Sequence, residues 1–135
     1  MLRSLFEGVV YSHLSHLEKL RDARGSDIHI EAVRLSGGGA RSAVWTQIFA
    51  DTLRLPMEVP DGTEIGARGA AMSAGIGVGV YKDHADAVDT AVKVKRRQEP
   101  NPAATPFYLA RYTEYKRLVE GMREPWDRLS RLSKG

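Results

Sequence analysis

Three consecutive glycines separate two segments of different periodicity, and they constrain the fold of this 135-residue sequence more than any other feature. The preceding segment, residues 28–35, is rich in β-branched and apolar residues and predicts a strand. After the run Ser36-Gly37-Gly38-Gly39-Ala40-Arg41-Ser42, apolar residues return at helical spacing: Val44, Trp45, Ile48, Phe49 and Leu53. The sequence therefore predicts a strand, a glycine turn and a helix in direct succession.

A short extended segment framed by prolines, Pro56-Met57-Glu58-Val59-Pro60, follows this helix. The prolines restrict it to a brief strand. Two strands joined by one helix are expected to be parallel and connected by a right-handed crossover. We therefore predict a βαβ unit within an α/β fold, in which helices pack on a short parallel sheet.

Further helices are predicted on both sides of this unit. The spacing of apolar residues predicts an amphipathic first helix that starts at Leu2 and stops near Arg24-Gly25, where glycine can adopt a left-handed conformation. A later helix consists largely of small residues, among them Gly66, Ala67, Gly69 and Ala70. Interior glycines cost a helix about 1 kcal/mol each relative to alanine, so we expect another part of the protein to pack closely against it.

The last third of the chain is predicted to hold two helices and a surface connection. Asp83 is placed to cap a short helix that contains residues 85–88. Residues 93–106 are charged and then proline-rich, which indicates a surface connection. A final helix over residues 107–132 carries an aromatic and aliphatic stripe that starts at Tyr108 and should pack on the body.

Composition excludes several classes of function. The absence of cysteine excludes a disulfide framework, a thiolate zinc site and a cysteine nucleophile. The 20 basic and 17 acidic residues are interspersed, so the net charge of +3 gives little support to a nucleic-acid partner. No apolar run approaches the roughly 18–20 residues that cross a bilayer, and the start of the chain lacks a secretory signal. We expect a cytoplasmic protein with no membrane partner.

The glycine run could hold a phosphate, because residues without a Cβ let the backbone approach a ligand and the following helix starts with unpaired N–H groups. The run matches neither the P-loop pattern nor the dinucleotide fingerprint. Taken alone, it is as compatible with a plain tight turn as with a phosphate contact.

Two longer stretches carry a more specific resemblance. Residues 34–53 closely resemble the adenosine-binding motif of the FGGY carbohydrate kinases, and residues 64–81 resemble the small-residue helix that follows in the same lobe. Residues 5–12 are similar to the family's helix before the nucleotide strand. The resemblance implies an actin-like ATPase (ribonuclease H-like) fold, in which residues 1–135 form most of the C-terminal nucleotide-binding lobe without its first strands. Within the family, these stretches most resemble kinases of xylulose, L-xylulose or erythritol.

The resemblance also implies a site and its ligands. Nucleotide contacts carry over to Gly37, Gly38, Gly39, Ala40 and Ser42, while Gly66, Ala67, Gly69 and Ala70 are expected to pack beneath the site. The cofactor would be ATP or ADP with Mg²⁺, the metal being held mainly outside this chain. The sugar or polyol and the catalytic base would belong to an N-terminal lobe, so this chain should be inactive alone. An exposed strand edge or apolar face is expected, and with it a homo-oligomer.

Some alternatives remain open. The chain could be a non-enzymatic, self-associating module of the same ancestry. Arg41 could contact a phosphate or face solvent. The basic run Lys93, Lys95, Arg96 and Arg97 is interpreted as a solvated linker ahead of a nucleic-acid site. The pair His13 and His16 is interpreted as a packing or surface pair, and Asp83, Asp86 and Asp89 as a helix start, so no metal site is predicted.

Overall fold

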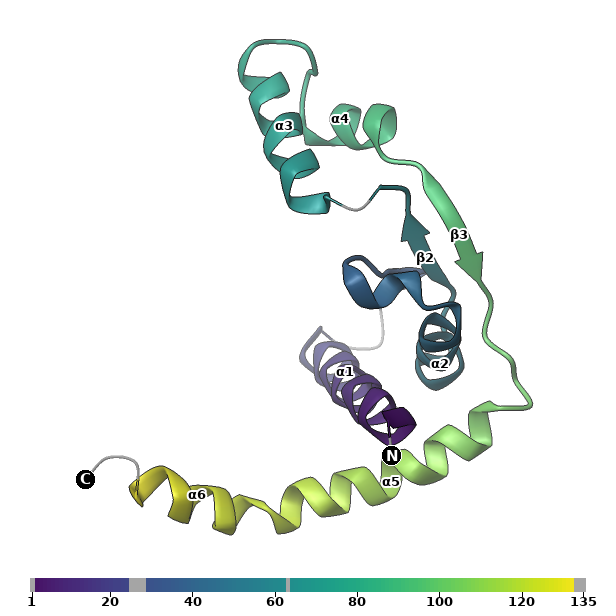
Figure 1. Cartoon of the computed structure of the whole chain (residues 1–135), viewed down its shortest axis with the longest axis vertical. Coiled ribbons are helices and arrows are strands. Elements are labelled where there is room, and N and C mark those ends of the chain that lie inside the picture. Colours follow the sequence, from purple (N-terminus) through teal and green to yellow (C-terminus); the bar gives the residue numbers. More distant parts are fainter. Residues whose placement is uncertain (1, 25–28, 63, 133–135) are drawn as a thin grey trace.

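The computed structural model describes residues 2–24, 29–62 and 64–132. Helices α1 (Leu2–Arg24) and α2 (Ala43–Leu53) form its centre together with a three-stranded sheet. Two helical arms extend from this centre in opposite directions (Figure 1). One arm holds α3 (Ile65–Gly77) and α4 (His84–Ala91), and the other holds α5 (Thr105–Gly121) and α6 (Arg123–Leu132).

The sheet has the order β1-β2-β3, with β1 at Val33–Arg34, β2 at Met57–Pro60 and β3 at Val94–Gln98. Strands β1 and β2 are parallel and are joined through α2, so the predicted βαβ unit is confirmed. Strand β3 is antiparallel to β2. The sheet is therefore mixed, and only its first pair has the parallel arrangement that the sequence predicts.

Strand β1 is much shorter than the predicted strand over residues 28–35. Ile28 lies outside the described residues, and residues 29–32 are irregular. The parallel ladder is limited by its partner, because Val33 N donates to Pro56 O and Leu35 N to Glu58 O at the start of the four-residue β2. The apolar side chains of Ile30, Val33 and Leu35 still pack against the core, which explains their pattern.

The prediction that residues 93–106 form only a surface connection is wrong, because Val94–Gln98 form strand β3. Its charged side chains stabilise it at the edge of the sheet. Arg34, Glu58 and Arg97 are aligned across the three strands, and Glu58 receives Arg34 Nε at 3.3 Å and Arg97 Nη1 at 2.7 Å. A strand held by backbone pairing and ion pairs has no apolar alternation by which sequence analysis could recognise it.

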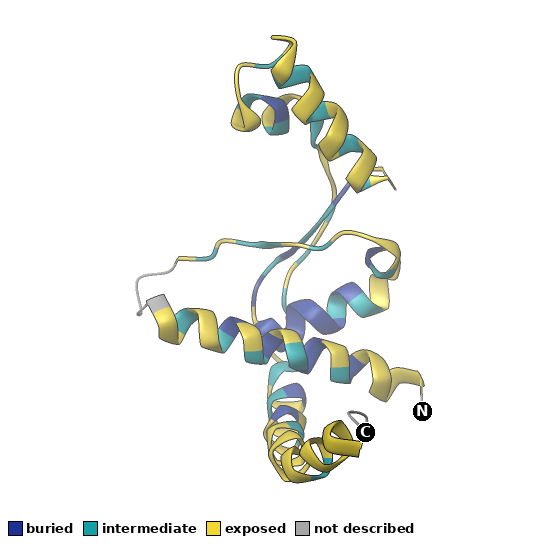
Figure 2. Ribbon diagram, turned by 90° about the vertical axis from the view of Figure 1, so that its left-hand side faces the viewer, coloured by how far each residue is buried: buried dark blue, intermediate teal, exposed yellow. Residues whose placement is uncertain are grey.

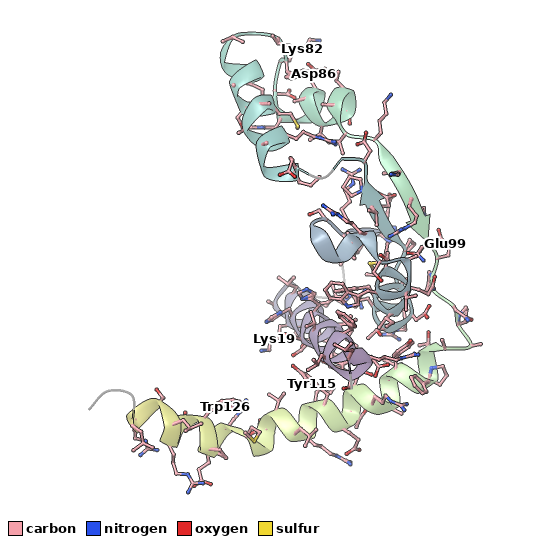
Figure 3. The ribbon with its side chains drawn as sticks, viewed as in Figure 1. Lys19, Lys82, Asp86, Glu99, Tyr115 and Trp126 are labelled. Carbon is pink, nitrogen blue, oxygen red and sulfur yellow. The ribbon has the colours of Figure 1, made fainter. Side chains whose placement is uncertain are left out.

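The hydrophobic core lies between α1, α2, the sheet and the first half of α5 (Figure 2). Its largest fully buried apolar side chains are Val10, Leu14 and Met57. Tyr108 and Tyr112 attach α5 to this core. The predicted helix over 107–132 is in fact two helices, separated at Met122, and Trp126 on α6 lies well away from α1 and α2 (Figure 3).

Helix α3 does not pack as expected. Its small residues Gly66, Ala67, Gly69 and Ala70 are exposed, and a Cβ added at Gly66 or Gly69 would meet nothing within 4 Å in the described part of the chain. The predicted close packing beneath the site is therefore wrong within these residues, because α3 stands on the arm beside α4 and away from the core (Figure 1). Asp83 caps α4 as predicted, with its Oδ1 accepting from Asp86 N at 2.9 Å.

None of the helices in residues 2–24, 29–62 and 64–132 combines the length and hydropathy needed to span a membrane.

Candidate functional site

The glycine run forms a turn of 3₁₀-helix, η1 (Gly38–Arg41), between β1 and α2. Gly37 precedes it with φ 91° and ψ −174°, a conformation that is essentially restricted to glycine. The turn is closed by Ala40 N donating to Gly37 O at 3.2 Å and Ser42 N donating to Gly39 O at 3.1 Å. The first amides of such a turn have no carbonyl acceptor inside it, so they are available to a ligand.

A pocket of about 580 Å³ lies beside this turn. Its walls come from the glycine loop, the end of β2, the start of α3 and the strand β3. The lining residues are Ser36, Gly37, Ala40, Arg41, Val59, Pro60, Gly62, Ile65, Lys95 and Arg96. Three of these described lining residues are cationic and none is acidic, so the pocket favours an anionic ligand.

Ser42 ends the loop and caps α2. Its Oγ accepts a hydrogen bond from Trp45 N at 3.2 Å, the usual role of serine at this position. Ser42 is exposed but does not line the pocket. Its hydroxyl is therefore already used to satisfy an amide of α2.

Gly39 is adjacent to the aromatic ring of Trp45. A Cβ added at Gly39 would overlap that ring, whereas one added at Gly38 would meet nothing within 4 Å. The ring of Trp45 lies 5.3 Å from that of Phe6 and 5.5 Å from that of Phe49, between centroids. Gly39 thus allows the loop to pack on an aromatic cluster that joins α1 and α2.

Arg96 holds the loop from the opposite side. Its Nη2 donates to Ala40 O at 2.6 Å and to Thr46 Oγ1 at 3.0 Å. Thr46 is fully buried, and its Oγ1 donates to Ser42 O at 2.8 Å. Sequence analysis assigned Arg96 to a solvated linker. Side chains alternate between the two faces of a strand, so the inward position of Arg96 could be predicted only if residues 94–98 were already known to form β3.

The wall formed by the start of α3 is fixed by an ion pair. Arg68 Nη1 lies 2.8 Å from Asp61 Oδ1, and Arg68 Nη2 donates to Asp61 O at 2.7 Å. The hydrogen bond from Arg68 is the main reason that the pKa of Asp61 lies below its usual value. Gly62 has φ 80° and turns the chain under the Arg68 guanidinium. These contacts orient Ile65, which lines the pocket.

The structure brings the candidate nucleotide residues into one loop but gives them different positions. Gly37 and Ala40 line the pocket, whereas Gly38, Gly39 and Ser42 lie in the same turn outside its lining. Arg41 is exposed and lines the pocket. Lys95 and Arg96 are the cationic lining residues that sequence analysis did not assign to this site.

The histidine pair lies elsewhere, on α1. The ring of His13 is 5.3 Å from the ring of Phe49, and burial, with a smaller contribution from His16, lowers the pKa of His13. No group of three side chains suited to hold a metal occurs within the described residues. The pocket beside the glycine loop is therefore the strongest candidate site in this part of the chain.

The pocket can bind an anion but offers little for proton transfer. Arginine and lysine supply charge and hydrogen-bond donors at neutral pH, and the exposed turn supplies backbone amides. Among the described residues that line the pocket, no carboxylate or histidine is placed to act as a base. Such a site suits the binding and orientation of phosphate groups.

Comparison with protein families gives one match: residues 1–78 match the C-terminal domain of the FGGY family of carbohydrate kinases. The L-xylulose/3-keto-L-gulonate kinase of Escherichia coli (strain K12) is 36% identical over 122 residues, which are 90% of this chain and 24% of that protein. The autoinducer-2 kinase of Enterobacter sp. (strain 638) is 33% identical over 127 residues, 94% of this chain and 22% of that protein.

Solved structures agree in fold. The xylulose kinase from Rhodospirillum rubrum superposes with a TM-score of 0.72 at 30% identity, over 92% of this chain and 24% of that one. A ligand-bound xylulose kinase from Lactobacillus acidophilus has a TM-score of 0.76 at 17% identity, over 89% of this chain and 24% of that one, and supports the fold alone. The chain spans about a quarter of the length of these relatives.

Proposed function

The chain belongs to the FGGY family of carbohydrate kinases, whose C-terminal domain it matches, and from this premise we propose that it forms the nucleotide-binding part of an ATP-dependent kinase. The complete enzyme would transfer a phosphoryl group from ATP to a hydroxyl group of a sugar or polyol. A pentulose such as xylulose or L-xylulose is the substrate class suggested by the relatives.

One observation carries this proposal: the glycine loop and three cationic side chains share a single pocket. Gly37 and Ala40 present the loop backbone to this space, and Arg41, Lys95 and Arg96 supply positive charge. The volume of about 580 Å³ lies in the usual range of small-molecule sites. The donors fit the α-phosphate and adenosine end of ATP or ADP.

The chemical step would depend on groups outside this chain. Phosphoryl transfer needs Mg²⁺ to neutralise charge on the phosphates and a base or orienting group on the acceptor hydroxyl. The contribution of this chain is to bind and orient the nucleotide, so that the γ-phosphate is aligned with an acceptor held by an N-terminal lobe. We therefore expect the chain alone to bind nucleotide and to give no sugar phosphorylation.

Calorimetric titration of the chain with MgADP tests the site. Gly38→Val would place a branched side chain on the open turn, and Arg41→Gln with Lys95→Gln would remove two charges from the pocket. Each variant should weaken binding about 10-fold or more, equivalent to about 1.4 kcal/mol. Lys82→Gln is the control for the loss of one positive charge outside the pocket, because Lys82 lies at the far end of the α3–α4 arm (Figure 3).

Unchanged affinity in both the loop variant Gly38→Val and the pocket variant Arg41→Gln with Lys95→Gln would place the nucleotide elsewhere. A kinase assay with MgATP and pentuloses tests whether the catalytic groups lie outside this chain. Turnover at an ordinary enzymatic rate by the chain alone would contradict that proposal.

A further inference from the structure

The polar side chains on the inward face of β3 form hydrogen bonds with the loop and with the first turns of α2. Gln98, two residues after Arg96, donates through Nε2 to Ala43 O and to Gln47 Oε1, both at 3.2 Å. Arg96 donates to Ala40 O, three residues before Ala43, and to Thr46 Oγ1, one residue before Gln47. One face of this edge strand is thus occupied with fixing the loop and the start of α2.

Arg96 differs electrostatically from three other arginines of this region, while the exposed Arg41 resembles it in having no carboxylate ion pair among the described residues. Arg34, Arg68 and Arg97 each have a carboxylate partner within 3.3 Å. Arg96 has no such ion pair among the described residues, and its buried Nε has no hydrogen-bond partner there. Its positive charge is also placed at the N-terminal end of α2, where the helix dipole makes a cation unfavourable and an anion favourable.

The contacts of Arg96 constrain the shape of the loop. Ala40 is 3% exposed, and its carbonyl group belongs to the turn η1. Thr46 Oγ1 accepts from Arg96 and donates to Ser42 O, so one guanidinium fixes both ends of the segment between η1 and α2. Only Nη2 makes these bonds in the described structure, which leaves Nη1 for a ligand in the pocket that Arg96 lines.

We propose that Arg96 is a positioning residue: it holds the glycine loop in its nucleotide-binding shape, and its unpaired charge is compensated by the phosphates of the bound nucleotide. The inference rests on the proposed nucleotide site and deepens it. It also assigns a role to β3, which lies beyond residues 1–78 that match the family domain.

The test compares Arg96→Met and Arg96→Lys with Arg97→Met. Arg97 is the adjacent residue on the same strand, but it pairs with Glu58 and Glu99 outside the pocket. All variants are made with Trp126→Phe, so that Trp45, which packs on the loop at Gly39, is the one remaining tryptophan of the two in the sequence. MgADP affinity is measured by calorimetry, and loop order by acrylamide quenching of Trp45 without nucleotide.

We expect Arg96→Met to weaken MgADP binding at least 10-fold and to raise the quenching constant of Trp45 clearly more than 2-fold. Arg96→Lys should recover part of the affinity because it keeps the charge but loses the planar pair of donors. Arg97→Met should stay within 2-fold of the parent in both measurements, although it loses two ion pairs. Values for Arg96→Met within 2-fold of the parent in both measurements would overturn the proposal.

Two further outcomes remain decisive. If circular dichroism shows that Arg96→Met does not fold, Thr46→Val, which removes the buried acceptor at nearly constant shape, must reproduce the change in Trp45 quenching. If the parent chain itself binds no MgADP, the proposed function fails for this chain, and the Trp45 measurement alone decides whether Arg96 orders the loop.

Discussion

Gly37, Gly38 and Gly39 are adjacent, yet each has a different physical reason to be glycine. Gly37 has φ 91°, Gly38 has open space around it, and Gly39 faces the ring of Trp45. The first needs a conformation that side chains rarely adopt, and the third needs the absence of a Cβ. Of these three glycines, only Gly38 has neither a positive φ nor a close neighbour in the described structure, so a ligand would be its reason to be glycine.

These differences predict unequal effects of alanine on stability. Gly37→Ala should lower the free energy of unfolding by about 1–3 kcal/mol through backbone strain, and Gly39→Ala by a similar amount through overpacking against Trp45. Gly38→Ala is the matched control and should leave stability unchanged or raise it by about 0.5–1 kcal/mol, since alanine restricts the unfolded chain. Urea denaturation measures all three, and equal losses would contradict the assignment.

Two buried tyrosines on neighbouring helices predict a dependence of stability on alkaline pH. Burial is the main cause that raises the pKa of Tyr11 and that of Tyr112 to about 12. The unfolded chain loses these protons first, at about pH 10. The free energy of unfolding should therefore be unaffected below pH 9 and fall as pH rises from 10 to 12.

Replacement by phenylalanine separates the two tyrosines. Tyr112 donates to Glu18 Oε2 at 2.7 Å, whereas the buried hydroxyl of Tyr11 has no partner among the described residues. Tyr112→Phe should cost about 1 kcal/mol at pH 7, and Tyr11→Phe should be neutral or stabilising. Both should flatten the alkaline decline in urea denaturation; a decline identical to that of the parent in both variants would show that other groups cause it.

At the scale of single residues, sequence analysis located the loop but not the residue that fixes it. Gly37 to Ser42 form a contiguous pattern, and contiguous patterns can be read directly. Arg96 lies more than fifty residues later and reaches the loop only because β3 pairs with β2. Its charge suggested solvent, since buried arginine without a carboxylate partner is uncommon.

Among the elements, helices were predicted better than strands. Helix α1 is described from Leu2 to Arg24, and Gly25, its predicted stop, lies outside the described residues; α4 starts after the Asp83 cap, as predicted. A helix is specified by its own periodicity and end residues. Strand β1 is shorter than predicted because its length depends on β2. Strand β3 was missed because its inward positions, Arg96 and Gln98, bind polar groups of α2 in place of an apolar core.

The charged alignment across the sheet predicts a salt-dependent contribution to stability. Glu58 is the central partner of Arg34 and Arg97, and its side chain is 17% exposed. Glu58→Gln should lower the free energy of unfolding by about 1 kcal/mol at low salt, because two arginines lose their shared carboxylate. The difference should shrink in 0.5 M NaCl, where these partly exposed charges are screened.

Glu114→Gln is the control, because the pair of Glu114 with Arg117 lies on the exposed surface of α5 and should contribute little at any salt concentration. A loss for Glu58→Gln that is equal at low and high salt would indicate a packing effect in place of the ion pairs.

At the scale of the whole molecule, the two arms leave apolar surface open. No residue of α6 is buried within the described chain, and Trp126 and Leu129 are 59% and 55% exposed. They continue a stripe that starts with Leu118 on α5 and Met122 between the two helices, at spacings of three and four. An amphipathic helix normally has a partner for its apolar side, and a second copy of the chain is the partner that we predict for this arm.

We therefore expect the chain to form a reversible oligomer whose mass in analytical ultracentrifugation increases with concentration. Trp126→Ser with Leu129→Ser should shift it toward monomer, because these changes remove the largest apolar side chain of α6 and its neighbour one turn on. Arg128→Gln with Arg131→Gln is the control on the polar side of the same helix.

A purely monomeric parent at high concentration would show that the arm does not associate by itself, and equal effects of both pairs would point to charge as the cause. The oligomer should still bind MgADP, since the glycine loop that borders the pocket lies on the other side of α1 from α6 (Figure 1). Loss of nucleotide binding on association would instead favour a module whose function is self-assembly.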